Sequence, residues 1–277
     1  MKKRVNLKVL ASLLIALAIA VTPALAEQLV IKGSTTVLPV AQKWIEAYMK
    51  ENPDVAISLS GGGSGNGIKA LIDGTTHIAT ASRFIKDSEV QFASAKNKYP
   101  VPFRVALDCI VPVVHPSNPV TNLTLSQLQG IYTGQVTDWK DLGGSSGKIV
   151  IVSRDSSSGT FEVWEDIVLE GGRVTPRSLV VASNGAVAQT VSKTKGAIGY
   201  VGMGYLNEDL KPVKVNNVMG SEATTRSGEY AISRPLFVFT NGWPEGTTLD
   251  FINFILSKTG QELVREVGSV PLFDPGR

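Results

Sequence analysis

The sequence has only one cysteine, Cys109, and only two histidines, His77 and His115. A lone cysteine cannot form an internal disulfide, and the apolar residues around Cys109 predict an inert thiol in a buried strand. Neither histidine lies in a spacing typical of metal ligands or of a catalytic site. The sequence therefore predicts no metal site, no cofactor and no catalytic residues.

An excess of positive charge is also missing once the N-terminus is set aside. Met1–Ala26 has a basic start, an apolar stretch and a small-residue end, which is the layout of a cleavable signal peptide. Its apolar stretch is too short to span a membrane. Without this segment, 23 of the 27 Lys and Arg residues remain against 24 Asp and Glu, which does not support binding to nucleic acid or to a membrane surface. No cysteine follows the signal for lipid attachment, so we expect a protein exported to the periplasm.

Strand and helix signals alternate along residues 27–277, which favours an α/β fold with mainly parallel sheets flanked by helices. One helix signal is the recurrence of Val40, Trp44 and Tyr48 every four residues, which places them on one face. Residues 249–267 are predicted to form one long helix. The hydrophobic content of 43% is enough for a large core without disulfides.

Two apolar runs, 105–114 and 235–240, have the character of strands that cross between two domains. We therefore expect a discontinuous first lobe, formed by residues 27–112 and 236–277, and a second lobe formed by residues 113–235. A ligand is expected in the cleft between the lobes.

Glycines and hydroxyl-bearing residues follow the predicted strands in four segments: Gly33–Thr36, Ser60–Gly67, Ala81–Arg83 and Arg154–Thr160. The carboxyl ends of parallel strands meet at one edge of an α/β sheet, so these segments are expected to converge. A helix signal follows the last segment, and a helix N-terminus attracts anions. Arg154 adds a planar fork of donors that matches a tetrahedral oxyanion. Each segment alone is also compatible with a helix cap, a flexible loop or a solvated arginine, but together they predict an anion site.

Six segments together resemble the phosphate-binding solute-receptor proteins of bacterial phosphate ABC transporters: residues 31–39, 61–65, 81–83, 131–139, 154–160 and 196–200. The resemblance implies the two-lobed type II periplasmic-binding-protein fold, with the ligand in the interlobe cleft. It also implies an exported, monomeric receptor that delivers inorganic phosphate to the membrane permease subunits of an ABC transporter. The phosphate-holding positions of that family correspond here to Thr35, Thr36, Ser64, Ser82, Arg154, Ser158, Gly159 and Thr160.

Arg83 departs from part of this family, in which an aspartate at this position accepts the proton of hydrogen phosphate and so rejects sulfate. Because Arg83 is itself a candidate ligand that only donates, selectivity for phosphate must come from another residue. Asp155 is our candidate, since it lies in the same turn as Arg154. It either accepts a phosphate O–H or holds the Arg154 guanidinium in place.

A receptor for another oxyanion, such as sulfate, molybdate or tungstate, is an alternative, because the same donor types bind all of them. An exported phosphatase or esterase is an alternative from a different class. Ser192 and Lys195 have the spacing of a Ser-x-x-Lys motif but lack the accompanying motifs. Gly143–Lys148 resembles a phosphate loop, yet Ile149 stands where Ser or Thr would meet magnesium. We therefore expect a binding protein rather than an enzyme.

Overall fold

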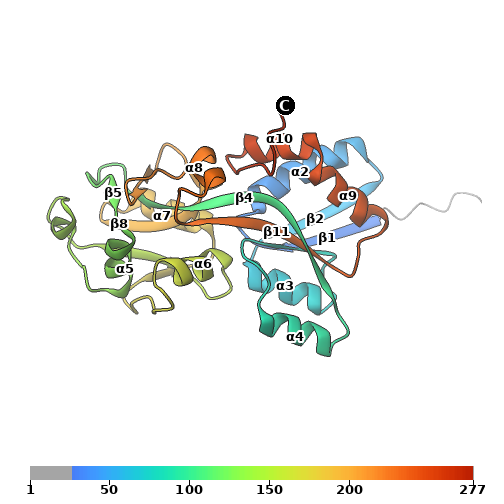
Figure 1. Ribbon diagram of the computed structural model, residues 1–277, viewed down its shortest axis with the longest axis horizontal. Coiled ribbons are helices and arrows are strands. Elements are labelled where there is room, and N and C mark those ends of the chain that lie inside the picture. Colours follow the sequence, from blue (N-terminus) through green and yellow to red (C-terminus); the bar gives the residue numbers. More distant parts are fainter. Residues whose placement is uncertain (1–26, 277) are drawn as a thin grey trace, which may run out of the picture.

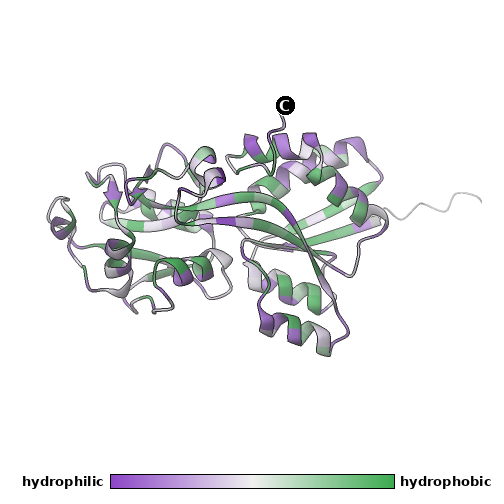
Figure 2. Ribbon diagram, in the orientation of Figure 1, coloured by the Kyte–Doolittle hydropathy of each residue, from purple (hydrophilic) through white to green (hydrophobic). Residues whose placement is uncertain are grey.

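The computed structural model describes residues 27–276, so the predicted signal peptide, Met1–Ala26, lies outside the described residues. The described chain forms two halves joined by two long strands (Figure 1). Many of the hydrophobic residues lie on the strands (Figure 2). Helices flank the strands in both halves, which confirms the predicted α/β class.

Three parallel strands begin the sheet of the first half: β1 (Glu27–Gly33), β2 (Val55–Ser60) and β3 (Ile78–Ala81). β1 lies in the middle and pairs with β2 on one side and β3 on the other. Parallel pairing places the carboxyl ends of all three strands at the same edge. The loops that follow them, which contain predicted site residues, therefore start side by side.

Helices cover both faces of this sheet. On one face lie α2 (Leu38–Glu51), α9 (Gly246–Leu256) and α10 (Lys258–Glu266), and on the other lie α3 (Ser64–Ile72) and α4 (Asp87–Ala95) (Figure 1). Val40, Trp44 and Tyr48 are buried on one face of α2, as their spacing predicts. The Trp44 indole donates a hydrogen bond to the Gly260 carbonyl at 2.8 Å, which ties α2 to α10.

β4 (Pro100–Val114) and β11 (Ser233–Asn241) form an antiparallel pair that runs through both halves. β11 pairs with β3 in the first half, and β4 pairs with β8 (Ala197–Gly202) in the second. The strand order is β2-β1-β3-β11-β4-β8-β6-β7, with β6 (Val150–Arg154) and β7 (Leu179–Val181) at the far end. Because β4 and β11 belong to both halves, the lobe boundaries near residues 112 and 235 stay a prediction.

The second half packs helices on the parallel strands β6, β7 and β8. Its other elements are α5 (Leu125–Thr133), α6 (Gly159–Ile167), α7 (Asn184–Lys193), α8 (Glu222–Ser227), the short strands β5 (Asn122–Leu123), β9 (Lys211–Pro212) and β10 (Lys214–Val215), and the 3-10 helices η1 (Trp139–Leu142) and η2 (Met203–Tyr205). In its core, the Trp164 and Tyr200 rings stack with centroids 4.3 Å apart, and Tyr132 packs edge-on against Trp164. These rings join α5, α6 and β8, and they fix the position of α6.

One expectation is wrong, because residues 249–267 form two helices, α9 and α10, rather than one. Ser257 separates them with an extended backbone, at φ −71° and ψ 170°. Its hydroxyl donates to the Phe254 carbonyl at 2.6 Å and accepts the Gly260 amide at 3.2 Å. A serine that hydrogen-bonds to the backbone of both helix ends favours a break in the helix over its continuation. The spacing of the apolar residues does not indicate this break.

α3 begins at Ser64, inside the glycine-rich segment. Gly63 makes this start favourable, because its φ of 101° is a conformation that other residues rarely adopt. Gly67 lies within the helix, where a Cβ would be 2.6 Å from the Gly33 Cα. These glycines therefore bring the start of α3 against the end of β1.

Candidate functional site

The loops after β1 and β2 are bonded through their backbones to the ends of the neighbouring strands β3 and β1. The Ser34 amide donates to the Thr80 carbonyl, and the Gly63 amide donates to the Gly33 carbonyl, both at 2.9 Å. Gly33 permits this approach, because a Cβ there would lie 2.1 Å from the Thr80 carbonyl oxygen. The three loops therefore form one continuous edge of the first half.

The hydroxyl-bearing residues of this edge are buried: Ser34, Thr35, Thr36, Ser64 and Ser82. Ser64 Oγ accepts the Ser82 amide at 3.0 Å and lies 3.4 Å from Ser82 Oγ. The predicted residues Thr35, Thr36, Ser64 and Ser82 thus share one buried edge. Burying a hydroxyl costs free energy unless it forms a hydrogen bond, so each of these hydroxyls is expected to have a hydrogen-bond partner.

The predicted helix N-terminus after the Arg154 turn is present in the second half. β6 ends at Arg154, and Ser158 caps α6 by accepting the Phe161 amide at 3.2 Å. Gly159 and Thr160 are buried in the first turn of this helix, where backbone N–H groups have no intrahelical acceptor. The first turn of α6 therefore offers free donors and a positive partial charge.

The N-terminus of α6 meets the first half directly. Thr160 Oγ1 lies 2.9 Å from Thr36 Oγ1, and the Gly65 amide donates to the Ser157 carbonyl at 3.0 Å. A Cβ on Gly159 would lie 2.4 Å from Ser64 Oγ, so the first helical position has room only for glycine. Residues of both halves thus form one buried polar cluster.

Arg154 is 2% exposed, and carbonyls at the end of β7 hold it in place. Its Nε donates to the Val181 carbonyl at 3.1 Å, and its Nη2 donates to the Ala182 carbonyl at 3.0 Å. The third nitrogen, Nη1, is buried and has no hydrogen-bond partner within residues 27–276. Burial lowers the pKa of Arg154. A guanidinium fixed along one edge and unpaired along another can receive an anion without reorienting.

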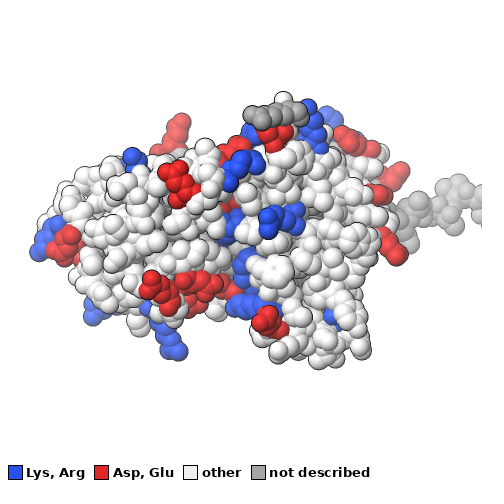
Figure 3. Space-filling model, in the orientation of Figure 1, with Lys and Arg blue, Asp and Glu red and all other residues white. Residues whose placement is uncertain are grey.

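Arg83 joins the two halves through carboxylates. Its Nη1 and Nη2 donate to the two carboxylate oxygens of Glu89 at 2.8 and 2.7 Å, and its Nε makes an ionic contact with Glu162 of α6 at 2.5 Å. Lys86 Nζ lies 2.9 Å from the same Glu162 oxygen, and Figure 3 shows acidic and basic side chains together at this junction. Burial acts to lower the pKa of Arg83, but Glu89 and Glu162 outweigh it and raise that pKa. A role for Arg83 as an anion ligand stays a prediction.

Asp155 is half-buried, and its Oδ1 bonds within its own turn. Oδ1 accepts the Ser157 amide at 2.9 Å and also the Ser157 hydroxyl. The Ser157 hydroxyl lies 3.1 Å from the Gly62 carbonyl oxygen of the first half. Both suggested roles of Asp155, as acceptor of a phosphate proton and as support for Arg154, stay predictions.

Three buried residues of the cluster escaped prediction: Asp108 in β4, Asn184 in α7 and Arg234 in β11. Arg234 Nη2 donates one hydrogen to Asp108 Oδ2 at 2.9 Å, and its other hydrogen is shared between Thr36 Oγ1 at 3.2 Å and Thr160 Oγ1 at 3.1 Å. Burial raises the pKa of Asp108 and lowers that of Arg234, while their pairing opposes both shifts. Asp108 is the one charged residue in the first apolar crossing run, which is a signal that marks it in the sequence.

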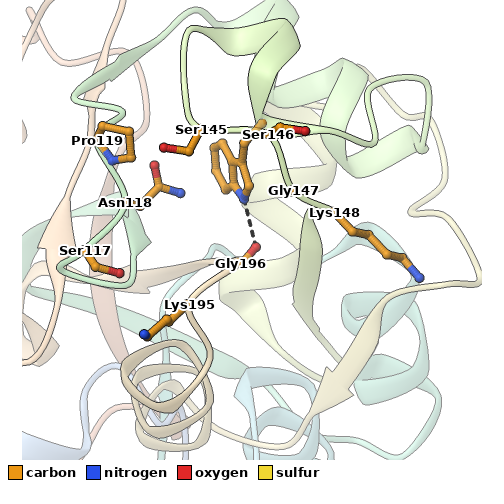
Figure 4. Close-up of a pocket in the computed structure, with 10 residues that line it drawn as sticks. Ser117, Asn118, Pro119, Ser145, Ser146, Gly147, Lys148, Lys195 and Gly196 are labelled. Carbon is orange, nitrogen blue, oxygen red and sulfur yellow. Dashed lines mark hydrogen bonds between the residues drawn. The ribbon is translucent and has the colours of Figure 1, made fainter.

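Gly143–Lys148 resembles a phosphate loop in sequence and lies just before the start of β6. Arg154 is at the other end of that strand. Part of the Gly143–Lys148 segment lines a surface pocket together with Asn118, Trp139 and Lys195 (Figure 4). The Trp139 indole donates to the Gly196 carbonyl at 3.0 Å in the wall of this pocket. Because a strand follows the segment, it has no helix N-terminus to receive a phosphate.

The described part of the chain contains no cluster of three or more His, Cys, Asp or Glu residues that could hold a metal ion. No helix between residues 27 and 276 has the length and apolar character needed to cross a membrane. Cys109 is buried, and burial raises the pKa of its thiol to about 12. Such a thiol stays protonated and unreactive at neutral pH, as expected for a core residue.

Comparison with known proteins finds a matching family and similar proteins along most of the chain. The sequence matches the PBP superfamily domain over residues 20–259. The phosphate-binding protein PstS of Borreliella burgdorferi is 32% identical over 250 residues, which are 86% of this chain and 88% of that protein. The phosphate-binding protein PstS of Bacillus subtilis is 30% identical over 248 residues, which are 89% of this chain and 81% of that protein.

Solved structures are similar over the same extent. A putative phosphate ABC transporter substrate-binding protein from Clostridium perfringens, solved with bound phosphate, has a TM-score of 0.83 at 33% identity, covering 89% of this chain and 100% of that chain. An ABC-type phosphate transport receptor from Vibrio cholerae has a TM-score of 0.72 at 32% identity, covering 87% and 99%. These likenesses confirm the type II periplasmic-binding-protein fold expected from the sequence.

Proposed function

We propose, since this chain belongs to the PBP superfamily and to the PstS phosphate-binding proteins within it, that it is an exported receptor for inorganic phosphate. It binds the anion between its two halves and delivers it to the membrane permease subunits of an ABC transporter. It acts in the periplasm as a monomer and binds no nucleic acid. The bound phosphate in the structure from Clostridium perfringens supports the choice of ligand.

The unpaired Nη1 of Arg154 is the observation that favours this function most. A buried cationic donor without a partner costs free energy, and an anion placed between it and the N-terminus of α6 removes that cost. The ligand-binding residues that we propose are Thr35, Thr36, Ser64, Ser82, Arg83, Arg154, Asp155, Ser158, Gly159 and Thr160.

The available donors are sufficient for a useful affinity. Phosphate has no apolar surface, so binding depends on hydrogen bonds, and bonds to a charged group contribute roughly 1.5–3 kcal/mol each. Eight such bonds give about 12–24 kcal/mol before the costs of association and ordering. A micromolar dissociation constant needs only about 8 kcal/mol net.

Titration calorimetry with phosphate, arsenate, sulfate and molybdate, alone and in competition, tests this function. We expect phosphate to bind and Arg154→Lys to weaken binding by about tenfold to a hundredfold, because lysine cannot bond the β7 carbonyls and the anion together. Arg104→Lys, at an exposed position of β4, is the matched control and should bind like the parent. A protein that binds sulfate or molybdate and ignores phosphate would be a receptor for another oxyanion.

We also propose that the protein has no catalytic turnover. Incubation of the purified chain with a chromogenic phosphoester should release no product. Product release that disappears in Ser158→Ala would instead support an exported phosphatase or esterase.

A further inference from the structure

The short helix η2, which directly follows β8 in the second half, contacts the first half at two places. Its Tyr205 hydroxyl donates to the Thr35 carbonyl oxygen at 2.5 Å, in the loop after β1. Its Gly204 packs against the segment that follows α10, where a Cβ on Gly204 would lie 3.0 Å from the Val267 carbonyl oxygen. These contacts are separate from those of α6, so two different elements of the second half meet the first half.

Thr35, a proposed ligand residue of the first half, is held by the second half through both its side chain and its main chain. Its Oγ1 accepts from the side-chain nitrogen of Asn184 at 3.1 Å and from the Asn184 backbone amide at 3.4 Å. Its carbonyl accepts from Tyr205. A Cβ on Gly185 would lie 3.8 Å from Tyr205 Cε1, so the start of α7 and the Tyr205 ring are adjacent. The position of Thr35 therefore depends on contact with the second half.

The Tyr205 hydroxyl is a donor that lies beside the proposed anion site. A carbonyl oxygen only accepts, so the single hydroxyl proton of Tyr205 is used in the bond to Thr35. Burial raises the pKa of Tyr205 to about 12, although Arg154 acts to lower it, so this proton is retained at neutral pH. The charge of Arg154 influences Tyr205 because the two side chains are close together. Tyr205 therefore ties the halves together next to the Arg154 guanidinium.

We propose, building on the phosphate-receptor function above, that Tyr205 is a positioning residue and that η2 is a clamp between the halves, which holds Thr35 at the anion and slows release. The Tyr205–Thr35 bond joins the two halves, so it forms only when they meet. An anion enters while the halves are apart, before this bond exists, and leaves after the bond has broken. The clamp therefore acts on the dissociation rate constant rather than on the association rate constant.

Tyr205→Phe tests the clamp, because it removes the hydroxyl donor and keeps the ring. Phosphorus NMR of the exchange between free and bound phosphate measures the dissociation rate constant. Calorimetry measures the dissociation constant, and the two values together give the association rate constant. We expect release to become about threefold to tenfold faster and association to stay within about twofold of the parent, because the lost hydrogen bond exists only in the closed arrangement.

Gly204→Ala tests the second contact of η2, since its methyl group would meet the Val267 carbonyl oxygen rather than Thr35. We expect faster release in this variant as well, because the added methyl separates η2 from the first half. Tyr230→Phe is the matched control. It removes the same atom from a tyrosine whose hydroxyl donates to the Ile110 carbonyl at 3.0 Å within the core of the second half. The control should keep both rate constants of the parent.

Parent-like release in Tyr205→Phe, or a loss of affinity that lies in the association rate constant, would overturn the inference and leave the receptor function intact. Faster release in Tyr205→Phe with parent-like release in Gly204→Ala would also overturn it, because Tyr205 would then act at the anion site without a clamp. A parent protein that binds sulfate but not phosphate would refute the proposed ligand. Calorimetry with sulfate would then decide the inference, since Tyr205→Phe and Gly204→Ala should weaken sulfate binding and Tyr230→Phe should not.

Discussion

At the scale of single residues, the partner of a buried arginine decides what that arginine can bind. Arg83 and Arg154 both follow or end a strand, and both are buried. Carboxylates surround Arg83 and compensate its charge, whereas backbone carbonyls hold Arg154 and leave its charge uncompensated. Arg154 is therefore the stronger attractor for an anionic ligand.

Asp155→Asn tests the origin of selectivity. We expect it to reduce the preference for phosphate over sulfate by about tenfold, because the proposed acceptor of the phosphate proton loses its charge. The amide oxygen still accepts the Ser157 amide and hydroxyl, so the turn is preserved. Competition calorimetry measures the ratio of the two affinities.

Asp138→Asn is the control for this change, since Asp138 Oδ1 also accepts two backbone amides, at 2.9 and 3.0 Å, in a turn before β6. An unchanged ratio in Asp155→Asn would limit Asp155 to a role in its turn.

At the scale of elements, α6 connects the second half to the first. Gly159, its first residue, packs against the hydroxyls of Ser64 and Ser82, and its second residue brings Thr160 to Thr36. The same helix end has free amides and a positive partial charge. Close contact between the halves and the proposed anion binding therefore depend on the same turn of helix.

Gly159→Ala should weaken phosphate binding by about fivefold to a hundredfold, because overpacking typically costs about 1–3 kcal/mol and the added methyl lies 2.4 Å from Ser64 Oγ. Calorimetry measures the affinity, and thermal unfolding checks that the variant is folded. Gly147→Ala is the control, since a Cβ at Gly147 meets nothing within 4 Å. Parent-like affinity in Gly159→Ala would contradict the need for this close approach.

At the scale of the whole molecule, two strands connect halves that also touch through side chains. The connection by β4 and β11 permits a hinge motion, and the contacts of Glu162 with Arg83 and Lys86 form only when the halves meet. Arg83 and Glu162 are largely buried, with 7% and 10% of their side chains exposed, whereas the side chain of Lys86 is 51% exposed. Opening the halves would leave the buried Arg83 and Glu162 charges without each other, and a buried charge without its partner is destabilising. The Arg83–Glu162 pair is therefore expected to stabilise the closed arrangement of the two halves.

A double-mutant cycle with Arg83→Gln and Glu162→Gln tests this closure. We expect both single changes to weaken phosphate binding, with a coupling of about 0.5–3 kcal/mol between them, because each removes the same contact. The exposed Lys43–Glu266 pair serves as the control cycle and should show no coupling in phosphate affinity. Independent losses at the two positions would instead favour Arg83 as a direct ligand.

The sequence by itself determined the features that depend on near neighbours. The fourfold spacing of Val40, Trp44 and Tyr48 determined the buried face of α2, and the serine before Gly159 determined the cap of α6. The alternation of strand and helix determined an α/β sheet, and parallel pairing then required the loops after β1, β2 and β3 to meet at one edge.

Only the tertiary structure decided which polar groups pair across the molecule. Thr36 meets Thr160 across 124 positions of sequence, and Arg234 meets Asp108 across 126. Arg83 faces Glu162 rather than an open cleft for the same reason, because the packing of α6 against the first half brings the carboxylate there. Spacing and capping signals describe a residue and its neighbours within a few turns, whereas the partner of a buried charge depends on how whole elements pack.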